Sequence, residues 1–326
     1  MIDPPLDSDE PEDKLDWLEL VALFASEKTV HIDSVINALE IAEDQEAENI
    51  ADADVGIETI QNDIAEEVQQ RTNALGEESY PYQISSNGET LKLRQGLTYG
   101  HKTYLACLVL NHSWATGKLV PPWKLNGPEI RAGRAHFEVF SAVAALGLSG
   151  GPSFLLGTNR ANAEGLLARI AQVCERVGEG SARPAVHEDA PDAANDDKVD
   201  VLAVEMENDA PPHRSFWFCQ SAAGADFVNK PIVNEVDRFL ELWFFDRPTN
   251  TSAAVFCPAL LTQTQVNYHT RRLGQIFHRL RMPLHAQRGF ALYEQNADLL
   301  NYVDDANAPC TWLDQYVERV EQVEGP

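Results

Sequence analysis

The sequence predicts an α+β or mixed α/β protein, with an N-terminal helical module followed by a mixed β-sheet flanked by helices. Two observations lead to this prediction. Apolar residues recur at helical spacing through much of residues 16–75, and short apolar runs at 199–204 and 215–220 lie among segments of helical pattern further along. From Arg134 the expected order is helix, loop, strand, strand, helix, strand, helix, which suits a mixed sheet with helices on its faces.

Two regions are expected, residues 1–120 and residues 121–326. In the first, the pattern predicts helices from Asp16, from Asp33 or Ser34, and over 55–75. Asn87-Gly88 between two alternating runs predicts a hairpin, and residues 101–113 are apolar enough for a buried helix. Residues 114–130 read as a linker.

In the second region the helices are expected at 133–147, 162–177 and 311–323, and the strands at 199–204, 215–220 and 253–258. Gly224 is expected to introduce a helix that runs to Phe245, and Thr262 to begin a basic helix. The Pro/Ala/Asp-rich residues 181–197 are expected to form a loop before the first of the paired strands. There is no internal repeat.

The chain has 326 residues and a net charge of −26, and this charge is unevenly distributed. Residues 1–80 hold 23 Asp and Glu against three Lys and Arg, whereas the remainder holds 28 against 22. Nucleic acid should be repelled by the first segment, so we expect it to recruit a protein partner through an acidic surface. The alternative interpretation is that residues 1–80 form a helical module whose acidic face is only solvated.

The later basic residues suggest a second surface. They cluster with three histidines near the C-terminus and comprise Arg271, Arg272, Arg279, Arg281, Arg288, His269, His278 and His285. Two interpretations are open: this segment contacts phosphate, or it pairs with the acidic N-terminal module of the same chain.

Composition points to the cytoplasm. No apolar run approaches the roughly 18–20 residues that a membrane span needs, and the N-terminus lacks the pattern of a signal peptide, so no membrane contact is expected. Five scattered cysteines argue against a disulfide framework, and no Cys-x-x-Cys spacing suggests zinc. Neither a Gly-x-Gly-x-x-Gly loop nor a Gly-x-Ser-x-Gly turn is present.

Acidic and amide side chains stand at the ends of the two paired apolar runs. Asp196-Asp197-Lys198-Val199-Asp200 opens the first run, and Gln220 closes the second. Two adjacent strands built this way bring Asp200 and Gln220 to one edge of a sheet, and a divalent metal ion needs such oxygen ligands. The plain alternative is a solvated strand face for Asp200 and a polar strand end for Gln220.

Three short motifs resemble the PD-(D/E)XK restriction-endonuclease-like superfamily. They are Gly133-x-x-x-Phe137-Glu138 on a helix, Asp197-x-x-Asp200-Val201 at a strand, and Phe218-Cys219-Gln220 at the next strand. Gln220 in place of an acidic residue resembles the Mrr-like variant, and the broader layout, including Tyr80-Pro81-Tyr82, is similar to bacterial proteins of the anti-phage defence type.

This resemblance implies a restriction-endonuclease-like sheet and a Mg²⁺- or Mn²⁺-dependent nuclease that hydrolyses DNA phosphodiesters in a prokaryotic defence or restriction system. It implies Glu138, Asp200 and Gln220 as metal ligands, with Asp200 and Gln220 also catalytic. The family's lysine two residues beyond Gln220 is replaced by Ala222, and the nearest downstream candidate is Lys230.

The absent lysine leaves a second interpretation open: a non-catalytic, degenerate nuclease fold that binds a protein partner through its acidic surface. Glu138 is then an ordinary surface carboxylate on an amphipathic helix. Glu205 and Glu207 alternate along the same strand, and an exposed strand edge is expected for them rather than a metal site. Cys219 is expected to be a buried, small apolar side chain.

Overall fold

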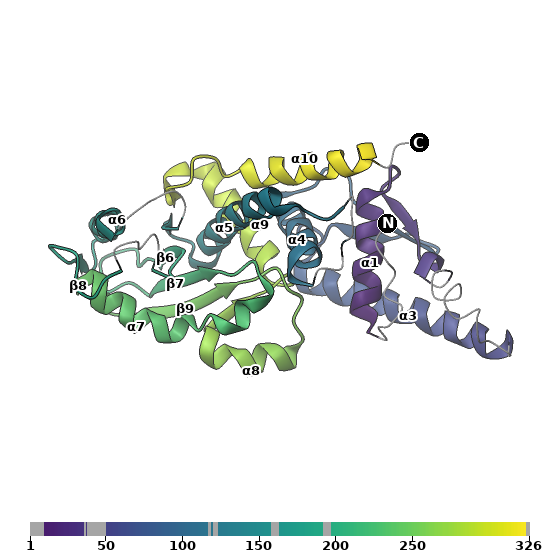
Figure 1. Ribbon diagram of the computed structural model, residues 1–326, viewed down its shortest axis with the longest axis horizontal. Coiled ribbons are helices and arrows are strands. Elements are labelled where there is room, and N and C mark those ends of the chain that lie inside the picture. The colour runs from purple at the N-terminus through teal and green to yellow at the C-terminus, as the bar shows by residue number, and fades with distance from the viewer. Residues whose placement is uncertain are drawn as a thin grey trace.

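The computed structural model describes residues 10–35, 37, 50–116, 119, 123–157, 163–191 and 197–323. Its main β-structure is a six-stranded mixed sheet (Figure 1). The strand order is β10 (Gln275–Phe277), β9 (Thr251–Phe256), β7 (Ser215–Ser221), β6 (Val201–Glu205), β4 (Ser153–Leu155) and β11 (Leu300–Asn301). β10, β9 and β7 are parallel, β6 is antiparallel to both neighbours, and β11 is parallel to β4. The predicted mixed α and β class is confirmed.

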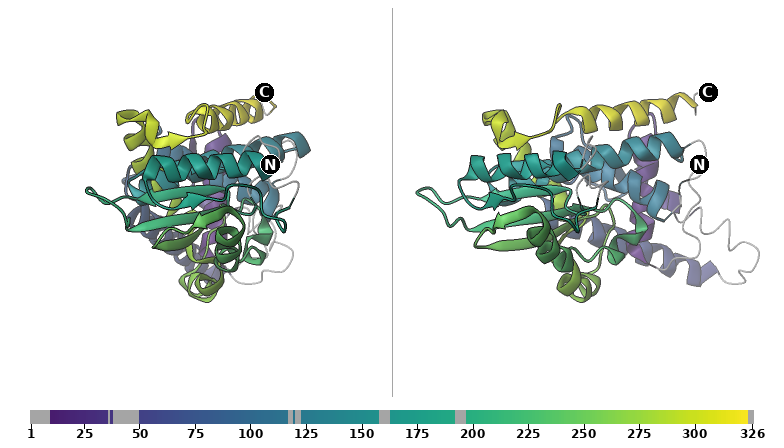
Figure 2. Two further views of the ribbon diagram at one scale, coloured as in Figure 1. Left: turned by 90° about the vertical axis from the view of Figure 1, so that its left-hand side faces the viewer. Right: turned by 60° about the vertical axis from the view of Figure 1, so that its left-hand side comes forward.

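The side chains of the sheet alternate between two apolar cores. Along β7, Trp217 and Cys219 belong to one core, whereas Phe216 and Phe218 belong to the other, as the strand period of two requires. Helices α4 (Tyr99–Leu110), α5 (Gly127–Ser149) and α9 (Met282–Gln295) contribute to the first core (Figure 2). Helices α6 (Ala163–Val177), α7 (Ile232–Trp243) and α8 (Gln263–Leu273) contribute to the second.

Helix α5 carries the predicted Phe-Glu motif and begins earlier than the pattern suggested. Asn126 caps it: the Asn126 side chain accepts from the backbone N–H of Glu129 at 3.0 Å, and the Glu129 carboxylate accepts from the N–H of Asn126 at 2.8 Å. This capping box and the proline in the first turn set the start at Gly127.

Helices α5 and α9 pack at very short range because glycines face each other. A Cβ added to Gly147 would collide with the backbone carbonyl of His285, and one added to Gly289 with that of Val143. Gly133 in turn leaves room for Leu110 and Trp312. The glycine of the predicted motif therefore has a packing role, because it lets α5 approach α4 and α10 (Ala308–Val323) closely.

The N-terminal region contains helices α1 (Pro11–Phe24) and α3 (Ile50–Leu75) beside a small antiparallel sheet. This sheet has the order β1 (Thr29–His31), β3 (Thr90–Leu93) and β2 (Tyr82–Ile84). β2 and β3 form the predicted hairpin, in which Gly88 takes the positive φ of 79° that its turn requires. Most of the helix expected after Ser34 lies outside the described residues.

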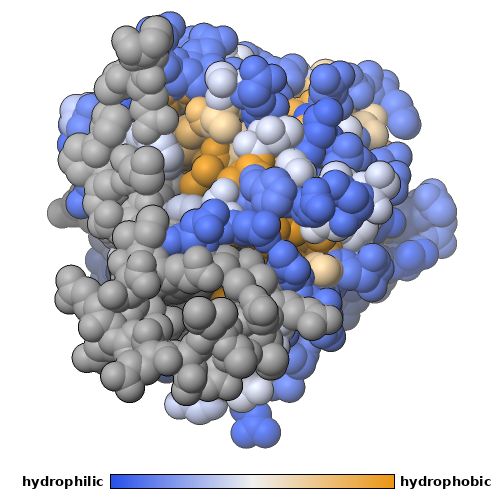
Figure 3. All heavy atoms as spheres, turned by 90° about the vertical axis from the view of Figure 1, so that its right-hand side faces the viewer, coloured by the Kyte–Doolittle hydropathy of each residue, from blue (hydrophilic) through white to orange (hydrophobic). Residues whose placement is uncertain are grey.

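One apolar core joins the two expected regions. It runs from Leu15 of α1 through α4 and α5 to Val320 of α10. The predicted buried helix over 101–113 is confirmed as α4 with the π-helical turn η1 (Asn111–Ala115). Lys28 pairs with Glu321, so the last helix also contacts the N-terminal region. The face of the molecule on the right-hand side of Figure 1 is largely hydrophilic where its residues are coloured, and a hydrophobic strip runs between the hydrophilic areas (Figure 3).

The expected helix from Gly224 to Phe245 is wrong, because three elements occupy that segment. A 3-10 helix η2 (Ala225–Asn229) comes first, α7 follows Pro231, and strand β8 (Phe244–Asp246) pairs with β5 (Ser181–Ala182). A proline lacks the backbone N–H that would continue a helix and restricts the residue before it, so the first turn cannot extend into α7.

The late basic segment is likewise two helices with a strand between them. The predicted helix start at Thr262 is confirmed, with Thr262 as the N-cap, but α8 ends at Leu273, where Gly274 adopts φ 69° against the carbonyl of Ala253. Strand β10 and helix α9 follow, and η3 (Ala297–Leu299) then leads into β11. The predicted adjacency of the runs 199–204 and 215–220 is confirmed by the β6–β7 pairing.

Candidate metal and phosphate site

One cavity, of about 600 Å³, contains all four predicted site residues. Glu138 comes from α5, Asp200 immediately precedes β6, Gln220 lies in β7, and Lys230 follows η2. The lining consists of Arg134, Glu138, Lys198, Asp200, Gln220, Ser221, Ala223, Ala225, Asp226 and Lys230. Residues from four separate segments thus meet where the central strands β6 and β7 approach α5.

The strand register explains why Asp200 and Gln220 meet. Val201 lies opposite Cys219 in the antiparallel β6–β7 pair, so continuing the pairing by one residue places Asp200 across from Gln220. Directly opposed residues of an antiparallel pair project to the same side. Both residues are only 8% exposed.

The Asp200 carboxylate is oriented by the backbone of the neighbouring strand. Its Oδ2 accepts a hydrogen bond from the Ser221 N–H at 2.7 Å, and its own carbonyl accepts from the Leu156 N–H at 2.7 Å. Ser221 Oγ lies 3.0 Å from Ser141 Oγ on α5, one turn beyond Glu138. Ser221 therefore connects the strand carrying Asp200 with the helix carrying Glu138.

Gln220 is a buried amide that faces the cavity. Among the described residues its side chain has no hydrogen-bond partner, although little of it is exposed. Because it lines the cavity, this amide is placed to bind a ligand there. In the described parts of the chain, no group of three His, Cys, Asp or Glu side chains could hold a metal ion, so Glu138 and Asp200 have no third side chain of these types beside them.

The donor set suits a hard divalent cation. Two carboxylates and an amide oxygen are ligands that Mg²⁺ and Mn²⁺ accept, and Mg²⁺ usually retains several waters in addition. Since no soft sulfur ligand lines the cavity, the residues present fit the ion that the resemblance implies.

Three cationic side chains line the same cavity. Lys198 Nζ lies 2.7 Å from Glu235 Oε1, and Lys230 is half-buried without an ion pair to any described residue. Slight burial lowers the pKa of Arg134, and the charge of Asp226 opposes this lowering. The two side chains therefore interact electrostatically. Cations and carboxylates in the lining are therefore balanced at three each, within a strongly acidic protein.

Sequence reasoning did not select Lys198 and Arg134 for this site. Arg134 stands four residues before Glu138, the spacing at which two side chains share one face of a helix. Lys198 stands two residues before Asp200, but its φ of 73° and the φ of 45° at Asp197 depart from an extended strand. The helical spacing could have indicated Arg134 as a site residue, whereas the sequence did not reveal the turn at 197–198 that positions Lys198.

The other acidic candidates serve structural roles. Asp197 pairs with Arg238 and accepts from Trp243 Nε1 at 2.9 Å, which fixes the turn before Asp200. Glu205 and Glu207 lie toward the opposite end of β6 and pair with Arg214 at 3.6 and 2.7 Å. Burial, reinforced by the charge of Asp200, raises the pKa of the Cys219 thiol, so this cysteine is an unreactive apolar group as expected.

The basic residues near the C-terminus divide between the two open interpretations. Arg279 is fully buried and both Asp16 carboxylate oxygens lie 2.6 Å from its Nη2, so this residue pairs with the acidic N-terminal region. Arg271 and Arg272 are exposed on α8, where no ion pair joins them to any described carboxylate. The phosphate interpretation therefore stays a prediction for those two residues.

Comparison with protein-family models, with curated proteins and with solved structures gave no significant match. Among the described residues, no helix combines the length and the apolar composition that crossing a membrane requires.

Proposed function

We propose that this protein is a metal-dependent phosphodiesterase of the restriction-endonuclease-like type that acts on nucleic acid, with DNA as the expected substrate. The observation that carries the proposal is the shared cavity of Glu138, Asp200, Gln220 and Lys230, which come from four segments of the chain. The mixed sheet with helices on both faces is consistent with the fold that the three motifs imply.

Each residue has a role that follows from its chemistry. Glu138, Asp200 and the Gln220 amide oxygen would hold Mg²⁺ or Mn²⁺, and the Ser221 N–H keeps the Asp200 carboxylate oriented. When bound, such an ion polarises a phosphoryl oxygen and lowers the pKa of an attacking water. Lys230 Nζ would donate to a phosphate oxygen and so stabilise the negative charge that develops there.

The cations of the cavity could replace the lysine that is missing at position 222. The family lysine is absent from the strand, but Lys230, Lys198 and Arg134 supply amine or guanidinium donors from neighbouring segments. Their charges offset three carboxylates locally, which permits a polyanion to approach a protein whose net charge is −26. We assign the phosphate-binding role to Lys230 because Lys198 is already paired with Glu235.

A second candidate function is a non-catalytic subunit that has kept this fold for binding a partner. Ala222 at the lysine position and Gln220 in place of a carboxylate favour it, because both changes weaken the chemistry of the site. In that case the acidic N-terminal region provides the main interaction surface, and the cavity binds phosphate without cleaving it.

Plasmid cleavage in Mg²⁺ or Mn²⁺ separates the two candidates. We expect wild-type protein to nick supercoiled DNA, and Asp200→Asn and Lys230→Met to lower the rate by about 10²-fold or more. The matched control is Glu205→Gln, at the other end of the same strand and outside the cavity, which should retain the wild-type rate within about 2-fold. Absence of cleavage by wild-type protein on both DNA and RNA, in either metal, would select the non-catalytic candidate.

A further inference from the structure

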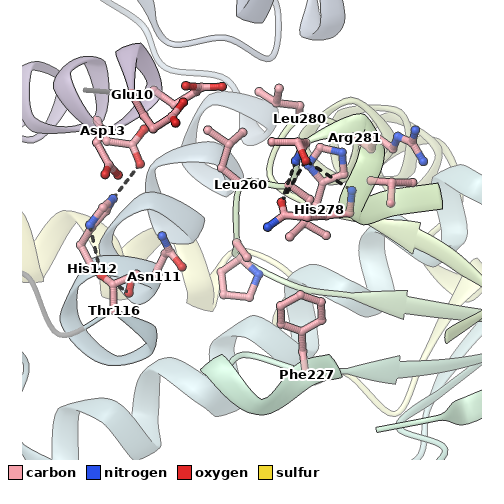
Figure 4. A pocket seen from close by; sticks show the side chains of 18 of the residues that line it. Glu10, Asp13, Asn111, His112, Thr116, Phe227, Leu260, His278, Leu280 and Arg281 are labelled. Atoms are coloured by element: carbon pink, nitrogen blue, oxygen red, sulfur yellow. Dashed lines mark hydrogen bonds and ion pairs between the residues drawn. The ribbon is translucent and has the colours of Figure 1, made fainter. Parts of the chain in front are cut away.

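A second and larger cavity, of about 940 Å³, lies between the N-terminal helices and the sheet domain (Figure 4). The start of α1, the face of α3 and the turn η1 form one side of it. Residues 258–266 and 278–281 form the other side. Its size falls within the range of about 300–1,000 Å³ that is common for ligand pockets.

The two sides of this cavity differ in chemistry. Glu10, Glu12 and Asp13 stand at the start of α1, and Asp16 and Glu67 lie deeper, where Arg71 pairs with both. Figure 4 shows Glu10 and Asp13 on one side and Leu260, Leu280 and Phe227 across from them. One side is therefore anionic, whereas the other is largely apolar and also carries Thr262, Gln263, Gln265 and Arg281.

His278 adds a buried polar group without a partner. The residue lines the cavity and is 4% exposed, and its Nδ1 has no hydrogen-bond partner within the described parts of the chain. Burial first, and then the charges of Arg281 and Arg279, lower the pKa of His278 to about 3, so the ring is neutral. Leaving this nitrogen buried without a partner costs free energy.

We infer that this cavity is the docking site for a basic, partly apolar peptide segment of a partner protein. Such a segment supplies positive charge to the acidic start of α1 and aliphatic side chains for Leu260 and Leu280. Nucleic acid is excluded because its phosphates would face the carboxylates at the start of α1. The site also gives the acidic N-terminal region a defined point of contact for the partner expected from its charge.

The docking site shares a wall with the candidate metal and phosphate site. Gly224, Ala225 and Phe227 line the larger cavity, whereas Ala225, Asp226 and Lys230 line the smaller one. The Lys230 N–H donates to the Phe227 carbonyl at 3.1 Å, so a shift of Phe227 is transmitted to the backbone of Lys230. A peptide bound in the docking site would therefore change the position of Lys230. The consequence for phosphate binding rests on the proposed function.

Fluorescence polarisation with three labelled hexapeptides tests the docking site. One alternates lysine and leucine, one alternates lysine and serine, and one alternates glutamate and leucine. The lysine–leucine peptide should bind wild-type protein at least about 10-fold more tightly than either of the others. Equal binding of the lysine–serine peptide would overturn the role of the apolar side.

Variants locate the binding within the molecule. Glu12→Lys on the acidic side and Leu280→Asp on the apolar side should each weaken lysine–leucine binding by about 10-fold, while Glu66→Lys should change it by less than about 2-fold. Glu66 is a matched control because it is exposed on the acidic helix α3 and lies outside the cavity. If the charge reversal Glu12→Lys prevents folding, the milder Glu10→Gln replaces it, because Glu10 is at an exposed position before α1. Glu10→Gln should weaken lysine–leucine binding by a smaller factor. Unchanged binding in the cavity variants would overturn the site.

Hydrogen–deuterium exchange reports the coupling without relying on catalysis. Bound lysine–leucine peptide should slow exchange of amides in residues 224–230, and the same peptide should change the rate of plasmid cleavage. Unchanged exchange with the peptide bound would overturn the coupling. Binding and protection without any cleavage would instead count against the proposed function and leave the docking site in place.

Discussion

Asp16 is the centre of a buried ionic cluster that joins the N-terminal region to the rest of the protein, so its replacement should be strongly destabilising. Its carboxylate accepts from Arg71 Nη1 at 2.7 Å, from Arg279 Nη2 at 2.6 Å and from His112 Nε2 at 2.7 Å. Arg71 and Arg279 are fully buried. Within the described residues, Arg279 Nε and Nη1 have no partner, so Asp16 supplies the hydrogen-bond acceptors of this guanidinium.

The expected magnitude follows from the charge that is left behind. Asp16→Ala removes the carboxylate that faces two buried guanidiniums, and Arg279 then has no hydrogen-bonded acceptor. Breaking a buried pair in this way costs about 3–5 kcal/mol. With a urea m value of about 3 kcal/mol per M, the unfolding midpoint should fall by about 1 M or more. The matched exposed pair is Lys102–Asp314 at 2.6 Å, where Asp314 is 49% exposed and Asp314→Ala should cost about 0–1 kcal/mol.

Equilibrium urea unfolding of the two variants, followed by circular dichroism, checks this prediction. Equal losses in Asp16→Ala and Asp314→Ala would refute the reasoning, because the buried cluster would then stabilise no more than an exposed pair. The pH dependence is a second check. Burial alone would raise the pKa of Asp16, but Arg279, Arg71 and His112 together hold it well below its usual range. Its contribution is therefore fully present above the unfolded pKa of about 4 and is lost only as pH falls through the lower folded pKa.

Two further predictions concern packing. Gly147→Ala should destabilise the protein by about 1–3 kcal/mol, because its Cβ would meet the His285 carbonyl, whereas Gly127→Ala has space and should be close to neutral in thermal unfolding. All five thiols are buried, and burial raises the pKa of Cys107 and Cys310 to about 12 and of Cys174 to about 11, so a thiol reagent should label none of them until the protein is unfolded. Rapid labelling of the native protein would contradict the buried placement.

Features that depend on local patterns were predictable from the sequence. Asn87-Gly88 specified the β2–β3 hairpin, and the two apolar runs specified the paired strands β6 and β7. That pairing then brought Asp200 opposite Gln220. The placement of Glu138 at the same cavity came from the family resemblance, and Lys230 was selected as the nearest basic residue downstream of Gln220.

Features that depend on tertiary contacts were not predictable. Strand β4 has three residues, too few to display a period of two, and exists because β6 and β11 pair with it. The burial of Arg279 required knowing that Asp16, 263 residues away, would face it. The break at Pro231, in contrast, carried a clear local signal that the expected helix from Gly224 overlooked, and Lys230 beside it lines the cavity.

Manganese binding, measured by isothermal titration, tests the central claim most directly because it requires no substrate. We expect wild-type protein to bind Mn²⁺, Asp200→Asn and Glu138→Gln to weaken binding by about 10-fold or more, and Gln220→Glu to strengthen it by adding a third carboxylate. Glu205→Gln, outside the cavity, should bind as wild type. Equal Mn²⁺ affinity in wild-type protein, Asp200→Asn and Glu138→Gln would contradict a metal site formed by these residues.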